Sequence, residues 1–202
     1  PTYAHRFLVQ HIATFLRANP SFFVALDVAP SDEVIRGILE ERFDLGIIGV
    51  ELSRDGLKLT PFRVSSPVCV MPVNHALATR DIIHAADLHE QPLIALTHRH
   101  ARRAQLEKEL TAAVSKPRIV AEVSTSVAAV DLARAGLGVA VVNPFPIVHF
   151  RADDVAFRPF ASGMEYRSYF VTSDNNPLPR LTRAFIRHQR LHTDSDPFSR
   201  KA

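Results

Sequence analysis

The segment "STSVAAVDLARAGLGVAVVNPFP" (residues 124–146) joins a helix pattern to a strand pattern. After three hydroxyl residues, apolar residues recur at the three- and four-residue spacing of an amphipathic helix, over about 125–135. Gly136 is a typical C-terminal end for such a helix. The small and β-branched residues of 138–142 predict a buried strand that ends at Asn143-Pro144. A helix followed directly by a buried strand is typical of α/β folds.

The same alternation runs along the rest of the chain. Helices are predicted at 3–18, from Pro30 onward, at 100–114 and at 177–192, and strands at 22–28, 44–50, 57–64, 67–73, 92–97, 118–123, 155–160 and 166–173. The alternation occurs twice, over 1–73 and about 91–150. It predicts two parallel-sheet α/β units packed side by side and joined by crossing strands. We expect the tail "HTDSDPFSRKA" (192–202) to be frayed.

The composition is that of a globular protein. Of the 202 residues, 47% are hydrophobic and 22% are charged, values that allow a substantial core. The single cysteine, Cys69, lies in the apolar run "PVCVMPV", so we expect a core residue and neither an internal disulfide nor a cysteine-based zinc site. No apolar run approaches the roughly 18 residues of a membrane span, and no signal peptide is visible.

The net charge of +3 raises the question of nucleic-acid binding. In "PRLTRAFIRHQRLH" (179–192), one helical face carries the arginines at positions 180, 183, 187 and 190. We interpret this face as the solvated side of an amphipathic helix whose apolar side includes Leu181 and Phe185. Charges elsewhere are mixed in sign, so the composition does not favour a nucleic-acid surface.

Signals for catalysis, cofactors and metals are weak. The sequence has no G-x-S-x-G elbow, no P-loop and no G-x-G-x-x-G fingerprint, and "GLGVA" precedes a strand instead of following one. The pairs His84/His89 and His98/His100 lack the helical metal-ligand spacing with an intervening Glu. We therefore expect no enzyme activity, no cofactor and no metal site.

Polar residues instead gather where predicted strands end. In open α/β sheets, ligands bind beyond the carboxyl ends of the strands. The residues at or next to such positions are Val50, Glu51, Thr97, Arg99, Ser124, Thr125, Ser126, Asn143, Pro144 and Phe145. Thr2 and Tyr3 join these candidates because they stand before the first predicted helix. Several lie at helix N-termini, where unpaired backbone N–H groups favour an anion such as a carboxylate. The alternative is that Ser124 or Thr125 is an ordinary helix N-cap.

Five ordered motifs carry a resemblance to a known family. They are "FLRANPSFFVAL", "RFDLGIIG", "NHALAT", "DLHEQPLIAL" and "ARAGLGVAVVNP". In this order and spacing, over residues 1 to about 192, the chain resembles the effector-binding domain of LysR-type transcriptional regulators. The segments "VVNPF" and "LIALTHRHARRAQLEKEL" look most like the branch that responds to lysine or diaminopimelate, arginine and opines.

The resemblance implies two Rossmann-like subdomains of the periplasmic-binding-protein type, with an effector cleft between them. We expect subdomain I at 1–90 plus 171–202 and subdomain II at 91–170. Family pocket positions fall on Thr2, on the loop after "LGIIG", on Thr97, on 124–126 and on Asn143 with Pro144. The resemblance also implies a cytoplasmic protein with no membrane association. Its effector domains form a homodimer, and the full-length protein forms a tetramer on DNA. DNA is read through an N-terminal winged helix-turn-helix that this chain lacks, and the family's first strand would precede Pro1.

The expected ligand is a small carboxylate metabolite, amino-acid-like or opine-like. Hydroxyls and backbone amides around Thr97 and Ser124–Ser126 would hold the carboxylate, and Glu51 would meet an amino group. Arg99 is a competing partner, because it suits a second carboxylate. A periplasmic-type solute-binding protein is the alternative function on this fold, and a small enzyme is a third, although no catalytic set supports it.

Overall fold

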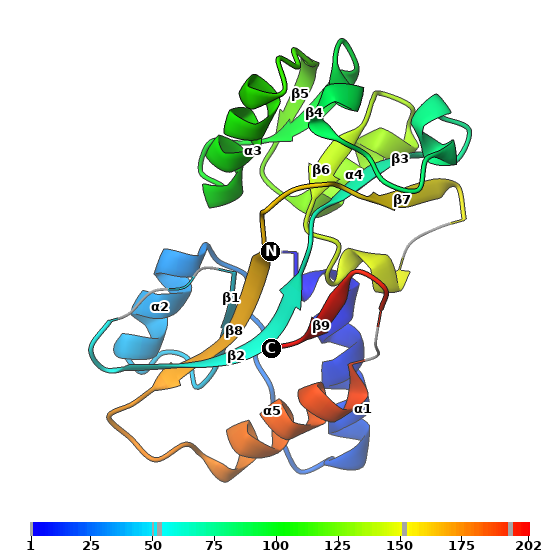
Figure 1. Cartoon of the computed structure of the whole chain (residues 1–202). Helices are drawn as coiled ribbons and strands as arrows, with labels where there is room; N and C mark the ends of the chain where they lie inside the picture. The colour runs from blue at the N-terminus through cyan, green and yellow to red at the C-terminus, as the bar shows by residue number, and fades with distance from the viewer. Residues whose placement is uncertain (1, 50, 52–53, 151–152, 194–195) are drawn as a thin grey trace.

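The computed structural model describes residues 2–49, 51, 54–150, 153–193 and 196–202. The chain forms two α/β lobes connected by long strands that cross between them (Figure 1). In the first lobe the sheet has the order β1-β8-β2-β9, with every neighbouring pair antiparallel. Its strands are β1 (Gly46–Ile48), β2 (Leu57–Ser65), β8 (Tyr166–Ser173) and β9 (Ser199–Lys201).

Helices pack against this sheet because each carries one apolar stripe. They are η1 (Ala4–Leu8), α1 (Val9–Ala18), α2 (Ser31–Leu39) and α5 (Arg180–His192). Ile35 and Ile38 of α2 are buried against Ile48 and Val171. The helix predicted at 3–18 is broken, since His5 and Arg6 have non-helical backbone angles within η1.

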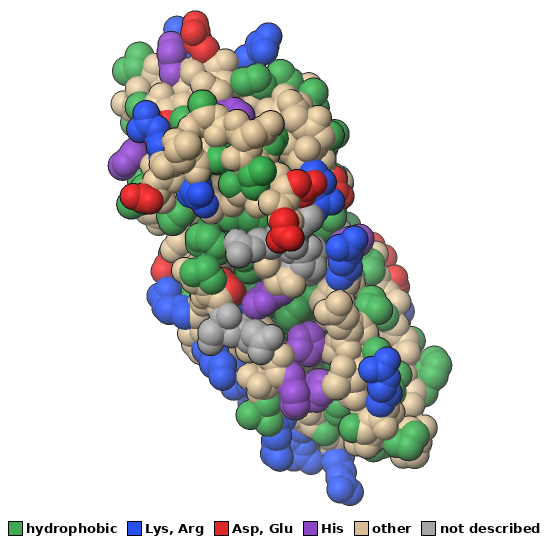
Figure 2. Space-filling model, turned by 90° about the vertical axis from the view of Figure 1, so that its right-hand side faces the viewer, with side chains coloured by type: hydrophobic (Ala, Val, Ile, Leu, Met, Phe, Trp, Pro, Cys, Tyr) green, Lys and Arg blue, Asp and Glu red, His purple; other side chains and the backbone are tan. Residues whose placement is uncertain are grey.

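Where α1 meets α5, aromatic and histidine rings pack together. The rings of His188 and His192 stack with centroids 4.1 Å apart, and the His11 ring lies 6.0 Å from His188. Histidine side chains line this face of the molecule (Figure 2). Burial lowers the pKa of His188, and the nearby His192 lowers it further. The neutral form of His188 therefore suits this packing.

The second lobe contains β3 (Val68–Pro72), β4 (Pro92–Leu96), β5 (Arg118–Val123), β6 (Ala140–Val142) and β7 (Val155–Pro159). One group has the order β6-β3-β7 and is antiparallel, whereas β4 and β5 pair in parallel. A parallel bridge from Leu93 to Val139 joins the two groups. The helices of the second lobe are α3 (Ala101–Ala112), α4 (Ser126–Arg134) and the short turns η2 (Ala76–Thr79), η3 (Ala85–Leu88) and η4 (Ile147–Phe150). The expectation of two purely parallel sheets is wrong, because the strands that cross between lobes run antiparallel to their neighbours.

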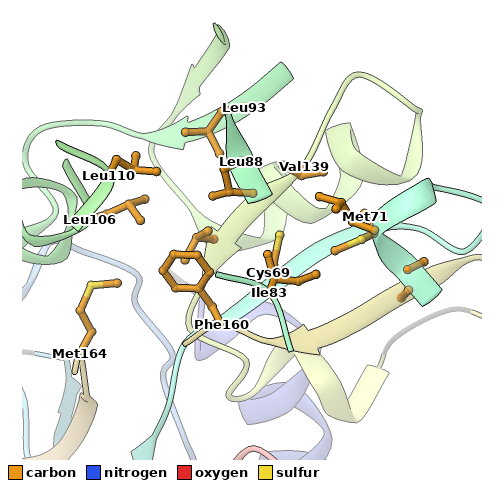
Figure 3. Packing of buried hydrophobic residues seen from close by; sticks show 14 residues of the cluster. Cys69, Met71, Ile83, Leu88, Leu93, Leu106, Leu110, Val139, Phe160 and Met164 are labelled. Carbon is orange, nitrogen blue, oxygen red and sulfur yellow. The ribbon is translucent and has the colours of Figure 1, made fainter. Parts of the chain in front are cut away.

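The core of the second lobe includes residues well before position 90. Cys69, Ile83 and Leu88 are fully buried beside Leu93 and Phe160 (Figure 3). A residue belongs with the core it helps to fill. We therefore propose that subdomain II extends over about 67–164, with subdomain I on either side, in place of the expected limits at 90 and 170.

The opening segment, 124–146, folds as its pattern predicts. Helix α4 is followed by Gly136 at φ +81°, the left-handed conformation that favours glycine at a helix end. At Gly138 a Cβ atom would lie 2.3 Å from the Pro92 carbonyl oxygen. This close approach lets Val139 donate its N–H to that oxygen at 2.8 Å, which sets β6 beside β4.

The strand predicted at 22–28 is wrong. No residue of this segment pairs in a sheet with another described residue, and Phe23 is 83% exposed. Apolar and β-branched residues favour a strand, but a strand needs a hydrogen-bonded neighbour. The described part of the chain offers none here.

The tail expected to be frayed is instead ordered over 196–202. Strand β9 pairs with β2 through Arg63↔Lys201, Val64↔Arg200 and Ser65↔Ser199. The Ser66 N–H donates to the Phe198 carbonyl at 3.2 Å. The tail therefore extends the sheet of the first lobe at the point where β2 continues toward the second lobe.

Among the described residues, no helix combines the length and the hydrophobicity that a membrane span requires.

Candidate ligand-binding site

Two turns in the second lobe follow the carboxyl ends of neighbouring parallel strands. The first, residues 97–100, joins β4 to α3, and the second, residues 124–126, joins β5 to α4. The Thr97 N–H donates to the Val123 carbonyl at 2.9 Å. His100 Nε2 lies 2.8 Å from the Ser124 carbonyl oxygen, and in the Nε2–H tautomer it donates to that oxygen. The structure therefore brings together Thr97 and Ser124–Ser126, as the strand-end rule predicts.

The Thr97 hydroxyl is the most informative group in these turns. Its oxygen is buried, and the part of the chain that the structure describes provides it with no hydrogen-bond partner. Buried hydroxyls are normally paired, because an unmade hydrogen bond costs about 1–3 kcal/mol. An unpaired hydroxyl at the carboxyl end of a strand is therefore a candidate contact for a ligand.

The three hydroxyl residues of the second turn have different roles. The Thr125 hydroxyl accepts from the Ala128 N–H at 3.1 Å, so it is the N-cap of α4. Ser126, the first residue of α4, is only 6% exposed. Ser124 is exposed and contributes its carbonyl to the contact with His100. The N-cap alternative thus holds for Thr125, and Ser126 lies beside the positive end of the helix.

The candidates of the first lobe surround the start of the chain and the end of β1. The Tyr3 hydroxyl lies against Gly49, where an added Cβ atom would be 3.4 Å from it. Burial raises the pKa of Tyr3 to about 12, with the Ser168 side chain opposing the rise. This phenol therefore stays protonated and can donate. Thr2 precedes it and is half-buried.

Glu51 is exposed and accepts a hydrogen bond from the Tyr169 hydroxyl at 2.8 Å. Burial, followed by this contact, raises the pKa of Tyr169. Val50, which was also a candidate, lies outside the described residues. Among the residues that the structure describes, no hydrogen bond joins Thr2, Tyr3 or Glu51 to the two turns of the second lobe.

The Asn143-Pro144 corner lies in the hinge between the lobes. Asn143 Oδ1 accepts from the Ser65 hydroxyl at 2.7 Å and from the Phe145 N–H at 3.1 Å. Pro144 is buried, and Phe145 is 1% exposed in a ring cluster with Phe62. These residues therefore pack the hinge, with little surface available to a ligand. Arg99 is exposed in the first turn.

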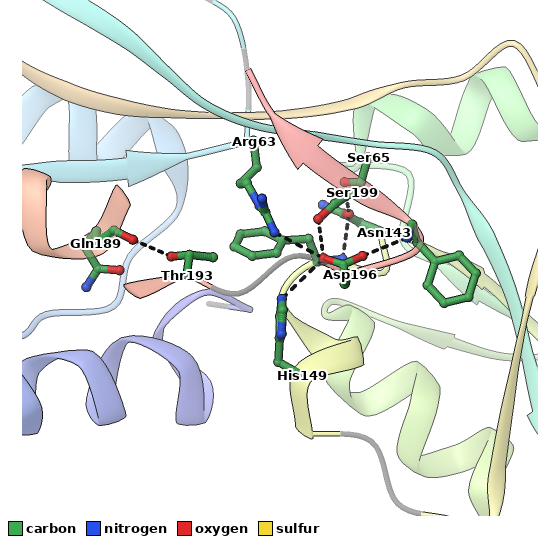
Figure 4. Close-up of polar contacts among 10 residues, drawn as sticks. Arg63, Ser65, Asn143, His149, Gln189, Thr193, Asp196 and Ser199 are labelled. Atoms are coloured by element: carbon green, nitrogen blue, oxygen red, sulfur yellow. Dashed lines mark hydrogen bonds and ion pairs between the residues drawn. The ribbon is translucent and has the colours of Figure 1, made fainter. Parts of the chain in front are cut away.

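A second polar cluster, which the sequence did not reveal, covers the hinge. Asp196 Oδ2 lies 3.3 Å from Arg63 Nη2 and 3.3 Å from His149 Nε2, and it also accepts from the Ser199 hydroxyl (Figure 4). Arg63 and Asp196 have side chains only 2% and 5% exposed. We call Arg63, His149, Asp196 and Ser199 the hinge cluster. It joins the tail to β2 of the first lobe and to η4 of the second.

Burial and pairing act in opposite directions on the ionisation of the hinge cluster. Burial raises the pKa of Asp196, but hydrogen bonds from His149, Ser199 and the Phe198 N–H outweigh it, so that the pKa lies below its ordinary value. Burial lowers the pKa of Arg63, and Asp196 opposes the shift. At neutral pH the pair is a buried ion pair. No motif marks it, since its members are 133 residues apart in sequence.

A hollow also separates the start of the chain from α4. It is lined by His5, Arg6, Val127, Val130, Asp131, Arg134 and Ile147. In this hollow, residues at the start of the chain face α4, the helix whose first residue is Ser126. Within the described ranges, no group of three or more His, Cys, Asp or Glu side chains could hold a metal ion.

A family model described as "LysR substrate binding domain" matches residues 1–193. The chain belongs to this family. The LysR substrate-binding domain described here is 30% identical over 174 residues to "Regulatory protein NocR" of Agrobacterium tumefaciens (strain T37), which covers 86% of the chain and 58% of that protein. It is 25% identical over 190 residues to "Transcriptional activator protein LysR" of Escherichia coli (strain K12), which covers 93% of the chain and 60% of that protein.

The fold of this LysR substrate-binding domain matches solved structures. With the regulatory domain of Synechocystis PCC6803 CcmR in complex with 2-PG, the TM-score is 0.76 at 18% identity, over 94% of the chain and 92% of that structure. The predicted two-lobed, periplasmic-binding-protein-like α/β fold is thereby confirmed, as is the resemblance to the effector-binding domains of LysR-type regulators. The chain spans about three-fifths of the length of the curated relatives it matches.

Proposed function

We propose that the domain binds a small carboxylate metabolite between its lobes, with the carboxylate against the two turns of the second lobe. The observation that carries this proposal is the buried Thr97 hydroxyl, which has no hydrogen-bond partner among the described residues. It lies next to the turn that begins α4, where Ser126 and the backbone N–H groups favour a negative charge. A carboxylate oxygen would satisfy Thr97 and benefit from this field.

An amino group at the other end of the ligand would meet Glu51. This carboxylate is exposed and held in place by the Tyr169 hydroxyl at 2.8 Å, so a cation could bind it without displacing it. Amino-acid-like ligands have both charges. Arg99, exposed in the first turn, suits a second carboxylate such as an opine or a dicarboxylic amino acid presents.

For the whole protein we propose a transcription regulator in which effector binding changes the angle between the lobes. The names of the relatives, a regulatory protein and a transcriptional activator, support this reading. The change would bias a DNA-binding segment outside this domain, because a ligand shifts a two-state equilibrium only by binding one state better. Acting on DNA places the protein in the cytoplasm, and binding alone requires no catalytic group.

A homodimer is the proposed assembly of this domain, and a tetramer that of the full-length protein. Exposed apolar side chains support a self-contact. They include Phe22, Phe23, Leu26 and Val28 in the first lobe and Ile119 and Val120 on β5 in the second. In a two-fold dimer, a contact between the two segments occurs twice. Sedimentation at tens of micromolar tests this: Phe23→Asp should shift a dimer to monomer, and a wild-type monomer would contradict it.

The binding proposal is tested by thermal shift and calorimetry with lysine, diaminopimelate, arginine and opines. A ligand at 100 times its Kd stabilises the folded state by about 2.7 kcal/mol. Ser126→Ala should weaken every carboxylate ligand by about 1–3 kcal/mol, and Arg99→Ala only those with an extra carboxylate. If Thr97→Ala, Ser124→Ala and Ser126→Ala all bind as tightly as wild type, the site assignment is wrong.

A further inference from the structure

Arg103 is a buried cation that contacts the ends of the two strands from which the two turns begin. It lies on α3, is 5% exposed, and its side chain donates to residues of three elements. Nη1 donates to the Leu96 carbonyl at 2.6 Å and to Glu122 Oε1 at 3.0 Å, and Nε donates to Glu107 Oε1 at 2.8 Å. One guanidinium therefore connects β4, β5 and α3.

These contacts fall immediately before the residues of the candidate site. Leu96 is the last residue of β4 and precedes Thr97, and Glu122 lies two positions before Ser124. The strands pair as Ala95↔Glu122 and Leu96↔Val123, so Arg103 closes the ladder at its carboxyl end. A second contact, His100 Nε2 to the Ser124 carbonyl oxygen at 2.8 Å, joins the first turn directly to the second. The two turns are thus held at two points.

A purely stabilising role does not explain this choice of residue. Removing a guanidinium from water is costly, and the Glu107 and Glu122 side chains that face it are 43% and 42% exposed, so solvent weakens both ion pairs. What arginine provides is direction, because the two N–H bonds of Nη1 lie at a fixed angle in the guanidinium plane and donate to two acceptors, the Leu96 carbonyl and Glu122 Oε1. The acceptors here are parts of two separate strand ends.

We propose that Arg103 is a positioning residue for the effector site: it fixes the spacing between the Thr97 hydroxyl and the N-terminus of α4. This inference rests on the proposed function. A carboxylate can accept from both turns only if their donors converge on it at about 2.7–3.2 Å. Without the hydrogen bonds of Arg103 the two turns move apart. The site then loses its selectivity for a carboxylate, even though Arg103 does not touch the ligand.

The first test measures the turns themselves, without ligand. Amide hydrogen exchange is followed at 97–100 and 124–127 in wild type, Arg103→Met, Arg103→Lys and Lys108→Met. Lys108 is exposed on the same helix, so Lys108→Met removes the same charge as a matched control. In Arg103→Met both turns should exchange about tenfold faster or more, the range expected for the loss of a charged hydrogen bond. In Arg103→Lys, whose donors are not fixed in one plane, the exchange rates should lie between those of wild type and Arg103→Met. The rates in Lys108→Met should match those of wild type.

The second test measures binding, with L-lysine and L-lysinamide as probes that differ in the carboxylate. Wild type should prefer L-lysine, and Arg103→Met should lose this preference at a temperature where it is fully folded. Unchanged exchange in both turns of Arg103→Met overturns the positioning role. Faster exchange with no binding of either probe to wild type leaves the positioning of the turns standing and counts against the proposed amino-acid ligand. Faster exchange with an unchanged preference for L-lysine contradicts the link to selectivity.

Discussion

The hinge cluster and the two turns of the second lobe each contain a buried side-chain oxygen, Asp196 Oδ2 and Thr97 Oγ1, and these two oxygens differ in whether they are paired. In the hinge cluster, Asp196 receives contacts from Arg63, His149 and Ser199. In the turns, the Thr97 hydroxyl is buried with no partner among the described residues. Buried polar groups that form hydrogen bonds with one another stabilise a structure. A buried polar group without a partner in the protein can form its hydrogen bond with a ligand instead. The comparison therefore separates the part that holds the lobes from the part that binds.

The largest effect is expected at the hinge cluster. Asp196→Ala removes the carboxylate that faces the buried Arg63 guanidinium, and breaking a buried pair in this way costs about 3–5 kcal/mol of unfolding free energy. Urea unfolding measures the loss. Ligand affinity per folded molecule should change little, because Asp196 is not in the turns. Asp81→Ala, at an exposed aspartate, is the control and should be nearly neutral.

The same cluster should make the stability fall in acid. The folded-state pKa of Asp196 lies below its unfolded value of about 4. Its contribution is therefore fully present above pH 4 and is lost as the pH falls through the folded pKa. Urea midpoints from pH 7 to pH 3 should fall less steeply in Asp196→Asn than in wild type. Parallel curves for the two proteins would remove Asp196 from the explanation.

Thr97→Val should separate stability from binding in the opposite sense. The substitution removes the unpaired hydroxyl and keeps the shape, so the ligand-free domain should be as stable as wild type or slightly more stable. Ligand affinity should fall by about 1–3 kcal/mol in calorimetry, because the carboxylate loses a donor. A clear loss of stability without ligand would indicate that Thr97 has a structural partner, and the contrast between the two regions would fail.

The smallest effect is expected for Thr125→Ala. Its hydroxyl caps α4 through the Ala128 N–H, and a lost N-cap costs about 1 kcal/mol. Thermal unfolding should show this loss, while affinity corrected for folding should remain near that of wild type. A fall in affinity as large as that of Ser126→Ala would indicate that Thr125 contacts the ligand and is more than a helix cap.

The sequence predicted what local patterns determine and missed what distant partners determine. Helix α4 and strand β5 follow from periodicity and β-propensity within their own residues. Residues 22–28 have a similar strand pattern but no neighbour to pair with, so the pattern alone misleads. Strand β9 was missed for the converse reason, since its pairing partner, β2 at Arg63–Ser65, lies far away along the chain.

The candidate site divides in the same way. Thr97 and Ser126 were found because the strand-end rule depends only on element order. Phe145 was assigned to the site because it follows the strand predicted at 138–142, but it fills the hinge, and only packing could reveal that. Arg103 was passed over because one arginine among several charges on a helix is usually solvated. Its burial becomes visible only when α3 is placed across the ends of β4 and β5.

The position of β9 has a consequence for the order of synthesis. Residues 196–202 emerge from the ribosome after β2, η4 and α5, all of which precede them in the chain. Until they emerge, the edge of β2 at Arg63–Ser65 lacks its neighbour, and the guanidinium of Arg63 lacks the carboxylate of Asp196. An open strand edge invites pairing with other chains. A nascent chain therefore keeps this edge of β2 open to pairing with other chains until the tail has emerged, and a stall between α5 and the tail would leave both lobes made but the edge of β2 uncovered.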